Sequence, residues 1–197
     1  MNEVLKAIYE RRAVRKFTPK KVGKEMIEIL LDAGRMAPSA INRQPWKFYV
    51  VTSKEEIKLY SKEIIIAGIK TIPKMGIKNV VKAVVSGITH LSHGIDFFKA
   101  DDPVFHGAPV VIFITGPKDN EWAALDIGMC CQNIMLAAKS MGLDTCPIGF
   151  GKFIEQTNAF SKLEISANEQ VHLALIVGYG NEKPELHERV KNNVFYK

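Results

Sequence analysis

The sequence predicts a single domain of the α+β class, and three observations point to it. Helical and extended patterns follow one another without the regular strand–helix–strand alternation that a doubly wound sheet requires. The run Pro109–Thr115 is continuously apolar and is followed by Gly116, as expected of a buried central strand. No internal repeat or Gly/Ser/Pro-rich linker divides the 197 residues. We therefore expect one domain over residues 1–197.

Five elements are expected in the first third of the chain. Val4, Leu5 and Ile8 have helical spacing behind Asn2, which is a suitable N-cap. The elements expected after this helix are an extended segment at 14–18, a helix over 26–34, a strand at 48–52 and a helix opened by a capping box of Ser53 and Glu56.

The segment between the second helix and the strand predicts a structured loop. Residues 37–46 contain two prolines and several small polar side chains, so neither helix nor strand is expected there. Ser39, Asn42 and Gln44 offer short donors and acceptors that suit the polar edge of a heterocyclic ligand. The alternative is a loop with a structural role only.

The second half of the chain predicts strands around one long apolar helix. Residues 122–141 are apolar or small on nearly all sides, so this helix is expected in a core or a subunit interface. Two strands are expected after it, at 145–148 and 172–177, with a helical segment over 152–161 between them. Residues 64–100 hold mixed apolar runs and several glycines, and they predict either helices that cover a site or a mobile lid.

The positive charge is concentrated in the first part of the chain. The protein carries 27 basic and 21 acidic side chains, but residues 1–82 hold 18 basic and 8 acidic ones, so the remainder is net negative. Only six basic residues are arginine, and Arg11, Arg12 and Arg15 lie within five positions. Clustered arginines favour forked recognition of an anion such as phosphate, and the alternative is a solvated helix end. A nucleic-acid binder is disfavoured, because apolar helices divide the charge and no helix-turn-helix or zinc-finger spacing is present.

Cysteine and histidine usage indicates neither a disulfide framework nor a metal site. Three cysteines are too few for a disulfide scaffold, which favours the reducing cytoplasm. No membrane-spanning segment and no secretory signal are expected. His90 and His93 lie three residues apart without a carboxylate or cysteine signature, so a polar helix face is favoured over a metal site. Cys146 is expected to be a buried, inert thiol rather than a reactive one.

Several motifs together resemble the nitroreductase family of FMN-dependent NAD(P)H oxidoreductases. The most specific is the Ala-Pro-Ser-x-x-Asn-x-Gln-Pro-Trp-x-Phe loop at 37–48. The Arg-Arg-x-x-Arg-x-Phe segment at 11–17, the Pro-Ile-Gly turn at 147–149 and the Val-Gly-Tyr-Gly run at 177–180 agree in order and spacing. The resemblance implies a nitroreductase-like fold, with a central mainly antiparallel sheet flanked by helices, in an intertwined homodimer with FMN at the subunit interface. It also implies that residues 64–100 cover the flavin and select the substrate.

The resemblance implies a role toward FMN at each matching position. Arg11 would bind the phosphate, Arg12 would lie along the ribityl chain and the phosphate, and Arg15 would lie near the pyrimidine edge. Arg189 would be a second phosphate ligand. The loop at 38–42 would contact the same flavin from the other subunit, and the turn at 148–149 would direct a backbone N–H at N5. The expected cofactor-binding residues are Arg11, Arg12, Ala13, Arg15, Pro38, Ser39, Ala40, Asn42, Gln44, Pro147, Ile148, Gly149 and Arg189.

These implied roles agree with the chemistry of flavins. Hydride reaches the flavin at N5, so a donor there orients the reacting atom, and a cation at the N1/O2 edge, for which Arg15 is suited, stabilises the reduced anionic form. Because the cofactor performs the reaction, no catalytic side chain is expected. NADH or NADPH would supply the electrons in a ping-pong cycle, and a small electron-poor acceptor such as a nitroaromatic or a quinone would take them.

Two departures from the family pattern bear on this expectation. Ala13 stands where the family often has Ser, which removes one hydroxyl donor to the phosphate. Gly149 stands where some members carry an acidic residue, which changes how the nicotinamide or the substrate is placed. The alternatives on the same scaffold are a reductive dehalogenase-like enzyme and a non-catalytic flavin-binding protein that stores or senses flavin.

Overall fold

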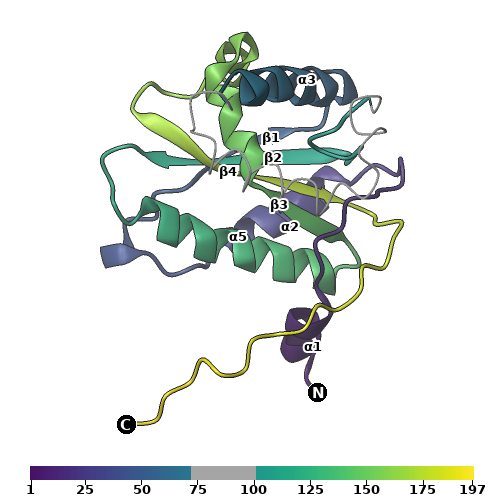
Figure 1. Ribbon diagram of the computed structural model, residues 1–197, viewed down its shortest axis with the longest axis vertical. Coiled ribbons are helices and arrows are strands. Elements are labelled where there is room, and N and C mark those ends of the chain that lie inside the picture. Colours follow the sequence, from purple (N-terminus) through teal and green to yellow (C-terminus); the bar gives the residue numbers. More distant parts are fainter. Residues whose placement is uncertain (72–100) are drawn as a thin grey trace.

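The computed structural model describes residues 1–71 and 101–197, and an antiparallel sheet runs through its centre (Figure 1). In the described residues the sheet has four strands in the order β1-β2-β4-β3, and each strand is antiparallel to its neighbours. The strands are β1 (Lys47–Val51), β2 (Val110–Pro117), β3 (Asp144–Ile148) and β4 (Glu169–Gly178). The expected α+β class with a central antiparallel sheet is thereby confirmed.

Helices cover both faces of the sheet (Figure 1). Two α-helices, α2 (Lys24–Arg35) and α5 (Ala123–Ser140), cover one face. The other face is covered by α3 (Lys54–Thr71) and by the 3-10 helices η3 (Gly149–Gln156) and η4 (Asn158–Leu163). The expected apolar strand at 109–115 is confirmed as β2, which is paired on both sides and buried along nearly its whole length.

The side chains of β2 alternate between two apolar clusters. Ile112 and Ile114 pack with α2 and α5, whereas Phe113 packs under α3. The Phe113 ring makes edge-to-face contacts with Tyr60 at 6.0 Å and Phe105 at 5.9 Å between ring centroids. A strand that is apolar on both faces therefore joins the two layers of the core.

Most expected elements are found within one or two residues of their predicted bounds. The first helix is α1 (Glu3–Glu10), and the Asn2 side chain caps it by accepting a hydrogen bond of 2.9 Å from Leu5 N. The expected long helix is α5, and the expected strands at 48–52, 145–148 and 172–177 are β1, β3 and β4. The segment at 14–18 is extended, as predicted.

The helix expected over 152–161 is corrected in type, because it consists of the two 3-10 helices η3 and η4. Gly151 lies so close to Ala174 of β4 that the segment follows the sheet in short, tight turns instead of a continuous α-helix. The structure extends α3 through Thr71, so the first residues of the 64–100 segment are helical. Its remainder, with His90 and His93, lies outside the described residues.

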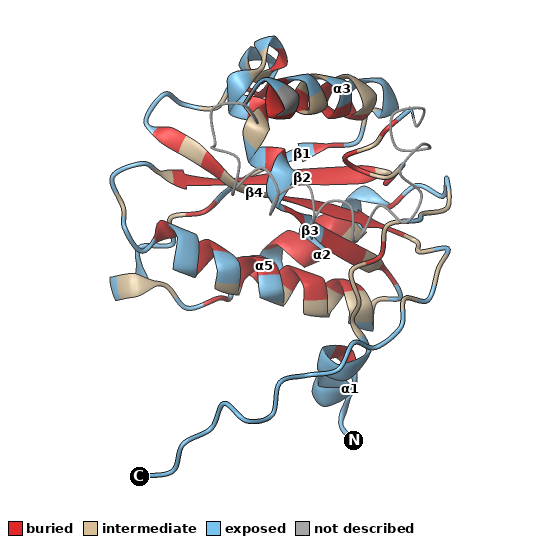
Figure 2. Cartoon of the chain, viewed as in Figure 1, coloured by how far each residue is buried: buried red, intermediate tan, exposed pale blue. Residues whose placement is uncertain are grey.

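Apolar side chains at both ends of the chain lie on the surface. In α1 only Ala7 is buried, whereas Val4 is 64% exposed and Ile8 is 45% exposed. The tail beyond Gly180 contains no helix or strand, and its Phe195 and Tyr196 are almost fully exposed (Figure 2). Within the described part of one chain, these apolar groups have no apolar surface to cover them. No helix among the described residues is long and apolar enough to cross a membrane.

Replacing Gly151 by alanine should lower the free energy of unfolding by about 1–3 kcal/mol, because the new Cβ would overlap Ala174 Cβ and lie 3.1 Å from Ala174 N. Thermal or denaturant unfolding measures the effect. The double variant Gly151→Ala/Ala174→Gly is the control, since it removes the Cβ–Cβ overlap and should recover part of the loss. Equal stabilities of wild type and Gly151→Ala would contradict this packing.

Candidate functional site

The arginine segment lies along the start of β3. The chain leaves α1 at Arg11 in an extended conformation, and Ala13 forms a parallel bridge with Thr145. Val14 N donates a hydrogen bond of 3.1 Å to Thr145 O. Because β3 contains Pro147 and Ile148 of the Pro-Ile-Gly motif and ends immediately before Gly149, two motifs that are about 130 residues apart in the sequence lie side by side.

The positive charges of Arg11 and Arg15 both act on the thiol of Cys146, which immediately precedes the Pro-Ile-Gly motif. Burial raises the pKa of Cys146, and the positive charges of Arg15 and Arg11 partly oppose the rise. Next to these charges, Pro147 and Gly149 are exposed, and a Cβ added at Gly149 would meet no atom within 4 Å. The arrangement therefore offers two cations beside a strand end that is open to a ligand.

Two arginines of the cluster donate to nearby backbone carbonyls: Arg15 Nη1 to Ala13 O at 3.4 Å, and Arg12 to the end of α1. The Nη1 of Arg12 donates to Tyr9 O at 2.6 Å and to Arg11 O at 2.8 Å, so its guanidinium caps carbonyls at the end of α1. This contact matches the structural alternative for a helix end, and it occupies one nitrogen of the guanidinium fork. The role of Arg12 toward a cofactor stays a prediction.

Two residues that had no assigned role lie beside Arg15. Glu182 Oε1 accepts a hydrogen bond of 2.5 Å from Arg15 N, which fixes the backbone that carries the guanidinium. His106 is also near, since Asp102, Arg15 and Glu182 all influence its pKa, although burial is the main cause of the lowered value. Glu182 is 167 positions from Arg15 in the sequence, so no local pattern indicates this contact.

The loop at 37–46 is held in a strained conformation. It contains a short 3-10 turn, η1 (Ala40–Asn42), and Ile41, Asn42 and Gln44 all have positive φ angles of 46–55°. A β-branched residue such as Ile41 rarely adopts this conformation. Ser39 Oγ accepts from Gln44 N at 2.9 Å, and Gln44 Nε2 donates to Asn42 Oδ1 at 3.0 Å. Strain that local hydrogen bonds maintain is typical of functional loops.

A buried carboxylate attaches this loop to α5. Asp126 is 1% exposed, and its Oδ1 accepts a hydrogen bond of 3.1 Å from Ala40 N. Its Oδ2 is buried without a hydrogen-bond partner in the described structure. Sequence reasoning missed Asp126, because a contact between residues 86 positions apart leaves no local pattern.

One chain does not bring its two groups of expected cofactor-binding residues together. Ala40 is held at the first turn of α5, whereas Ala13 pairs with Thr145, which follows the last turn of that helix. An 18-residue helix is about 27 Å long, and Figure 1 shows η1 and the arginine segment toward its opposite ends. Arg189 lies in the exposed tail, where its Nη1 donates to His187 O at 3.1 Å.

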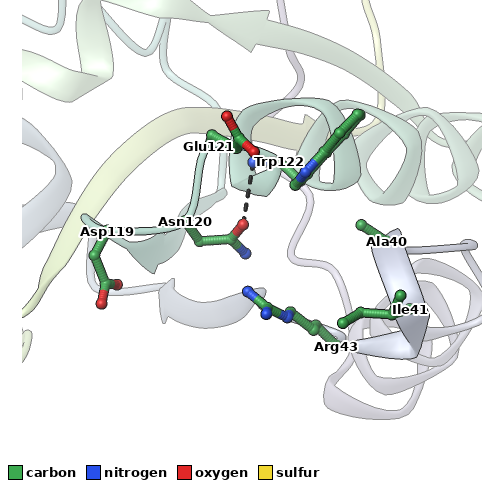
Figure 3. A pocket seen from close by; sticks show the side chains of 7 residues that line it. All are labelled: Ala40, Ile41, Arg43, Asp119, Asn120, Glu121 and Trp122. Carbon is green, nitrogen blue, oxygen red and sulfur yellow. Dashed lines mark hydrogen bonds between the residues drawn. The ribbon is translucent and has the colours of Figure 1, made fainter.

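A cavity of about 500 Å³ lies between the strained loop and the start of α5 (Figure 3). Its lining residues are Ala40, Ile41, Arg43, Asp119, Asn120, Glu121 and Trp122. Ala40 is the one expected cofactor-binding residue among them, and no group of three or more His, Cys, Asp or Glu side chains suited to a metal occurs in the described residues.

Comparison with known proteins gives a consistent result. The model of the nitroreductase family matches residues 8–179. A 4-nitrobenzoate reductase of Pseudomonas putida is 27% identical over 89% of this chain and 84% of its own length. A Staphylococcus epidermidis protein named as an NAD(P)H nitroreductase is 29% identical over 98% of this chain and 94% of its own.

Solved structures agree with the sequence comparison. A nitroreductase with bound FMN from Desulfitobacterium hafniense aligns with a TM-score of 0.80 over 100% of this chain and 99% of its own, at 26% identity. The FMN- and NADPH-dependent nitroreductase NfnB of a Sphigopyxis strain aligns with a TM-score of 0.80 over 98% of both chains, at 21% identity. These alignments confirm the nitroreductase-like fold.

We expect the three thiols to be unreactive in the native protein. Burial raises the pKa values of Cys130 and Cys131 to about 12 and raises that of Cys146, so at pH 8 all three remain protonated as well as inaccessible. A chromogenic disulfide reagent should label none of them until the protein is unfolded, and should then label three. Rapid labelling of one thiol in the native state would show that the burial of that residue is wrong.

Replacing Asp126 by alanine should destabilise the protein by about 1–3 kcal/mol, because the partly buried Ala40 N would lose its acceptor. Hydrogen exchange resolved to single amides should show faster exchange at Ala40. Asp126→Asn keeps an acceptor and is the matched control, with a smaller change in both quantities. Unchanged exchange at Ala40 in the alanine variant would contradict the attachment.

Proposed function

The chain belongs to the nitroreductase family, and we propose that it transfers electrons from NADH or NADPH to an electron-poor aromatic acceptor. The protein is an FMN-dependent oxidoreductase of this family. The observation that supports the proposal is the backbone pairing of the arginine segment with β3, which ends at the exposed Gly149. We place the protein in the cytoplasm, where its three free thiols stay reduced.

The described residues fit a flavin mononucleotide. Arg11 supplies a cation for the phosphate, and Arg15 supplies one for the pyrimidine edge. The absence of a side chain at Gly149, with open space where a Cβ would lie, lets a planar ring approach the backbone closely. Glu182 fixes the Arg15 backbone, which limits how far that guanidinium can move.

When bound, FMN accepts a hydride from the nicotinamide and supplies the electrons that reduce the acceptor. The side chains of this protein have three tasks: to bind the phosphate, to orient the ring and to stabilise negative charge at its N1/O2 edge. No described side chain needs to act as a nucleophile or a general acid for this chemistry. We propose a ping-pong order, in which NAD(P)H and the acceptor occupy the same place in turn.

We infer that the complete site requires two copies of the chain. The loop at 38–44 and the arginine segment lie toward opposite ends of α5 in one chain, so a second copy would have to supply the loop. The uncovered apolar side chains of α1 and of the tail are available for such an interface. Arg189, in the same tail, would then reach a phosphate only in the assembled dimer.

The acceptor that we propose is a nitroaromatic compound. The P. putida relative carries the name of a 4-nitrobenzoate reductase, and it matches this chain over most of the length of both. A nitro group on a benzene ring is electron-poor and flat, so it can stack on a planar cofactor. Quinones share both properties and are the second acceptor class to test.

The purified protein should be yellow, release FMN on denaturation and lose its visible absorbance when NADH or NADPH is added without air. A nitroaromatic acceptor should then restore the absorbance. A flavin that neither nicotinamide reduces would instead indicate storage or sensing, and turnover of haloaromatic but not nitroaromatic compounds would indicate the dehalogenase alternative. A colourless protein that takes up no added FMN would overturn the proposal.

Arg11→Ala should weaken FMN binding about tenfold or more, because it removes one charge-assisted contact to the phosphate. Flavin fluorescence during titration of the apoprotein measures the dissociation constant. Lys16→Ala is the matched control, since Lys16 is an exposed cation of the same segment and should leave affinity within about twofold. Equal affinities for wild type and Arg11→Ala would refute the assigned role.

The native mass in solution should correspond to a dimer that binds two FMN molecules. Sedimentation or light scattering, combined with flavin absorbance, measures both quantities. Deleting the tail from residue 185 onward should weaken both the dimer and FMN retention, because the deletion removes the apolar side chains proposed for the interface together with Arg189. A monomer with full FMN occupancy would exclude a site shared between two copies.

A further inference from the structure

The cavity beside the strained loop contains an arrangement that the proposed flavin site does not use. Arg43 extends its guanidinium toward the side chain of Asn120 (Figure 3). Asn120 Oδ1 accepts a hydrogen bond of 3.1 Å from Trp122 N, so the amide is oriented with its Nδ2 on the other side, toward Arg43. Two groups of N–H donors therefore face one another across the cavity, with no acceptor of the described protein between them.

The two nearby carboxylates do not neutralise Arg43. Asp119 and Glu121 line the cavity, but Figure 3 shows both carboxylates directed away from the guanidinium. Arg43 forms no ion pair with any residue in the ranges 1–71 and 101–197, whereas Arg35 is paired with Asp32. An unpaired guanidinium that faces a second donor is suited to a carboxylate, which accepts hydrogen bonds on both oxygens.

The remaining walls of the cavity are suited to an aromatic ring. The indole of Trp122 and the side chain of Ile41 lie on one side of it, and they are 49% and 83% exposed. A volume of about 500 Å³ is within the range of small-molecule sites. A smaller hollow of about 240 Å³ shares Arg43, Asp119 and Asn120 with this cavity, and Pro45 and Pro117 complete its lining.

The backbone presents Arg43 in a defined direction. Arg43 lies between Asn42 and Gln44, whose positive φ angles and mutual side-chain hydrogen bond fix the loop around it. Its own N–H donates to Ala40 O at 3.1 Å, and Ala40 is in turn attached to Asp126. A side chain on a fixed backbone loses less freedom on binding than one on a mobile loop.

We propose that Arg43 and Asn120 form an anion subsite that selects acceptors carrying a carboxylate on an aromatic ring, with the ring against Trp122. The proposal rests on the proposed function, because it names the substrate class of that same reductase. Arg43 acts here as a specificity residue and takes no part in electron transfer. Ala40, which is expected to contact the flavin, lies in the same wall, so an acceptor anchored at Arg43 would lie next to the cofactor.

The test compares 4-nitrobenzoate with 4-nitrobenzamide, which have the same ring and nitro group and differ in charge. In the holoenzyme, Arg43→Gln should lower the ratio of kcat/KM for the acid to that for the amide by about tenfold, mainly through KM for the acid. Arg43→Lys should recover part of the ratio, and Asn120→Ala should lower it less. Lys162→Gln, which removes one exposed positive charge on η4, is the matched control and should leave the ratio unchanged.

A second measurement separates this proposal from the proposed function. Benzoate, titrated into the protein as purified, should quench the fluorescence of exposed Trp122, and Arg43→Gln should abolish the quenching at the same concentrations. Binding of benzoate that depends on Arg43, in a protein that NAD(P)H does not reduce, would support the subsite and refute the reductase. If the enzyme reduces acceptors but Arg43→Gln lowers kcat/KM equally for the acid and the amide, or for neither, the subsite alone would be refuted. A change in KM for NADPH but not for 4-nitrobenzoate would assign Arg43 to the nucleotide phosphate and would also overturn the proposal.

Discussion

Burial of the central strands on both faces is the constraint on which the rest of the structure depends. β2 and β4 lie between two apolar layers, so every peptide group in them has to be paired within the sheet. Such strands cannot carry polar side chains for a ligand without a cost in burial. The residues that we propose to bind an anion therefore lie outside these two strands, in the extended N-terminal segment, the loop before β1, the segment between β2 and α5, and the C-terminal tail.

The extended segment at 13–17 extends this paired region. Ala13 pairs with Thr145 on β3 and Phe17 with Gly180 after β4, so a segment from the start of the chain covers the outer edge of β3. This pairing determines where Arg15 lies, because the backbone is paired on both sides of it, whereas Arg11 and Arg12 precede the paired segment. The lysines of residues 1–71, by contrast, are mostly exposed, although Lys47 and Lys58 pair with Glu169 and Asp101.

The sequence predicted the fold where apolar periodicity or a cap decides the local structure. The local structure at Asn2, in the continuous apolar run of β2 and in α5 can be predicted from residues only a few positions apart in the sequence. The segment of η3 and η4 was predicted as helical but not as 3-10. Its geometry follows from the close contact of Gly151 with Ala174, which lies in a strand that comes after this segment in the sequence.

The candidate site, too, could be predicted only in part from the sequence. The arginine cluster, the proline-bounded loop and the Pro-Ile-Gly turn are recognisable as motifs, and the structure brings the cluster and the turn together. The sequence did not indicate a role for Asp126, His106 or Glu182. Each of them interacts with a residue far away in the chain, and no recognisable motif surrounds it. The distance between the loop and the arginines in one chain depends on the three-dimensional fold, so the spacing of these residues in the sequence could not predict it.

In the function that we propose, the strained loop connects the cofactor site to the choice of acceptor. Left-handed conformations at Ile41, Asn42 and Gln44 cost conformational energy, and the buried carboxylate of Asp126 together with the hydrogen bonds within the loop offsets it. A loop held in this way can present Asn42 toward a cofactor and Arg43 toward a cavity from adjacent positions. Because both residues depend on one backbone conformation, a substitution that relaxes the loop should affect cofactor binding and acceptor selection together, whereas a substitution of the Arg43 side chain should affect selection alone.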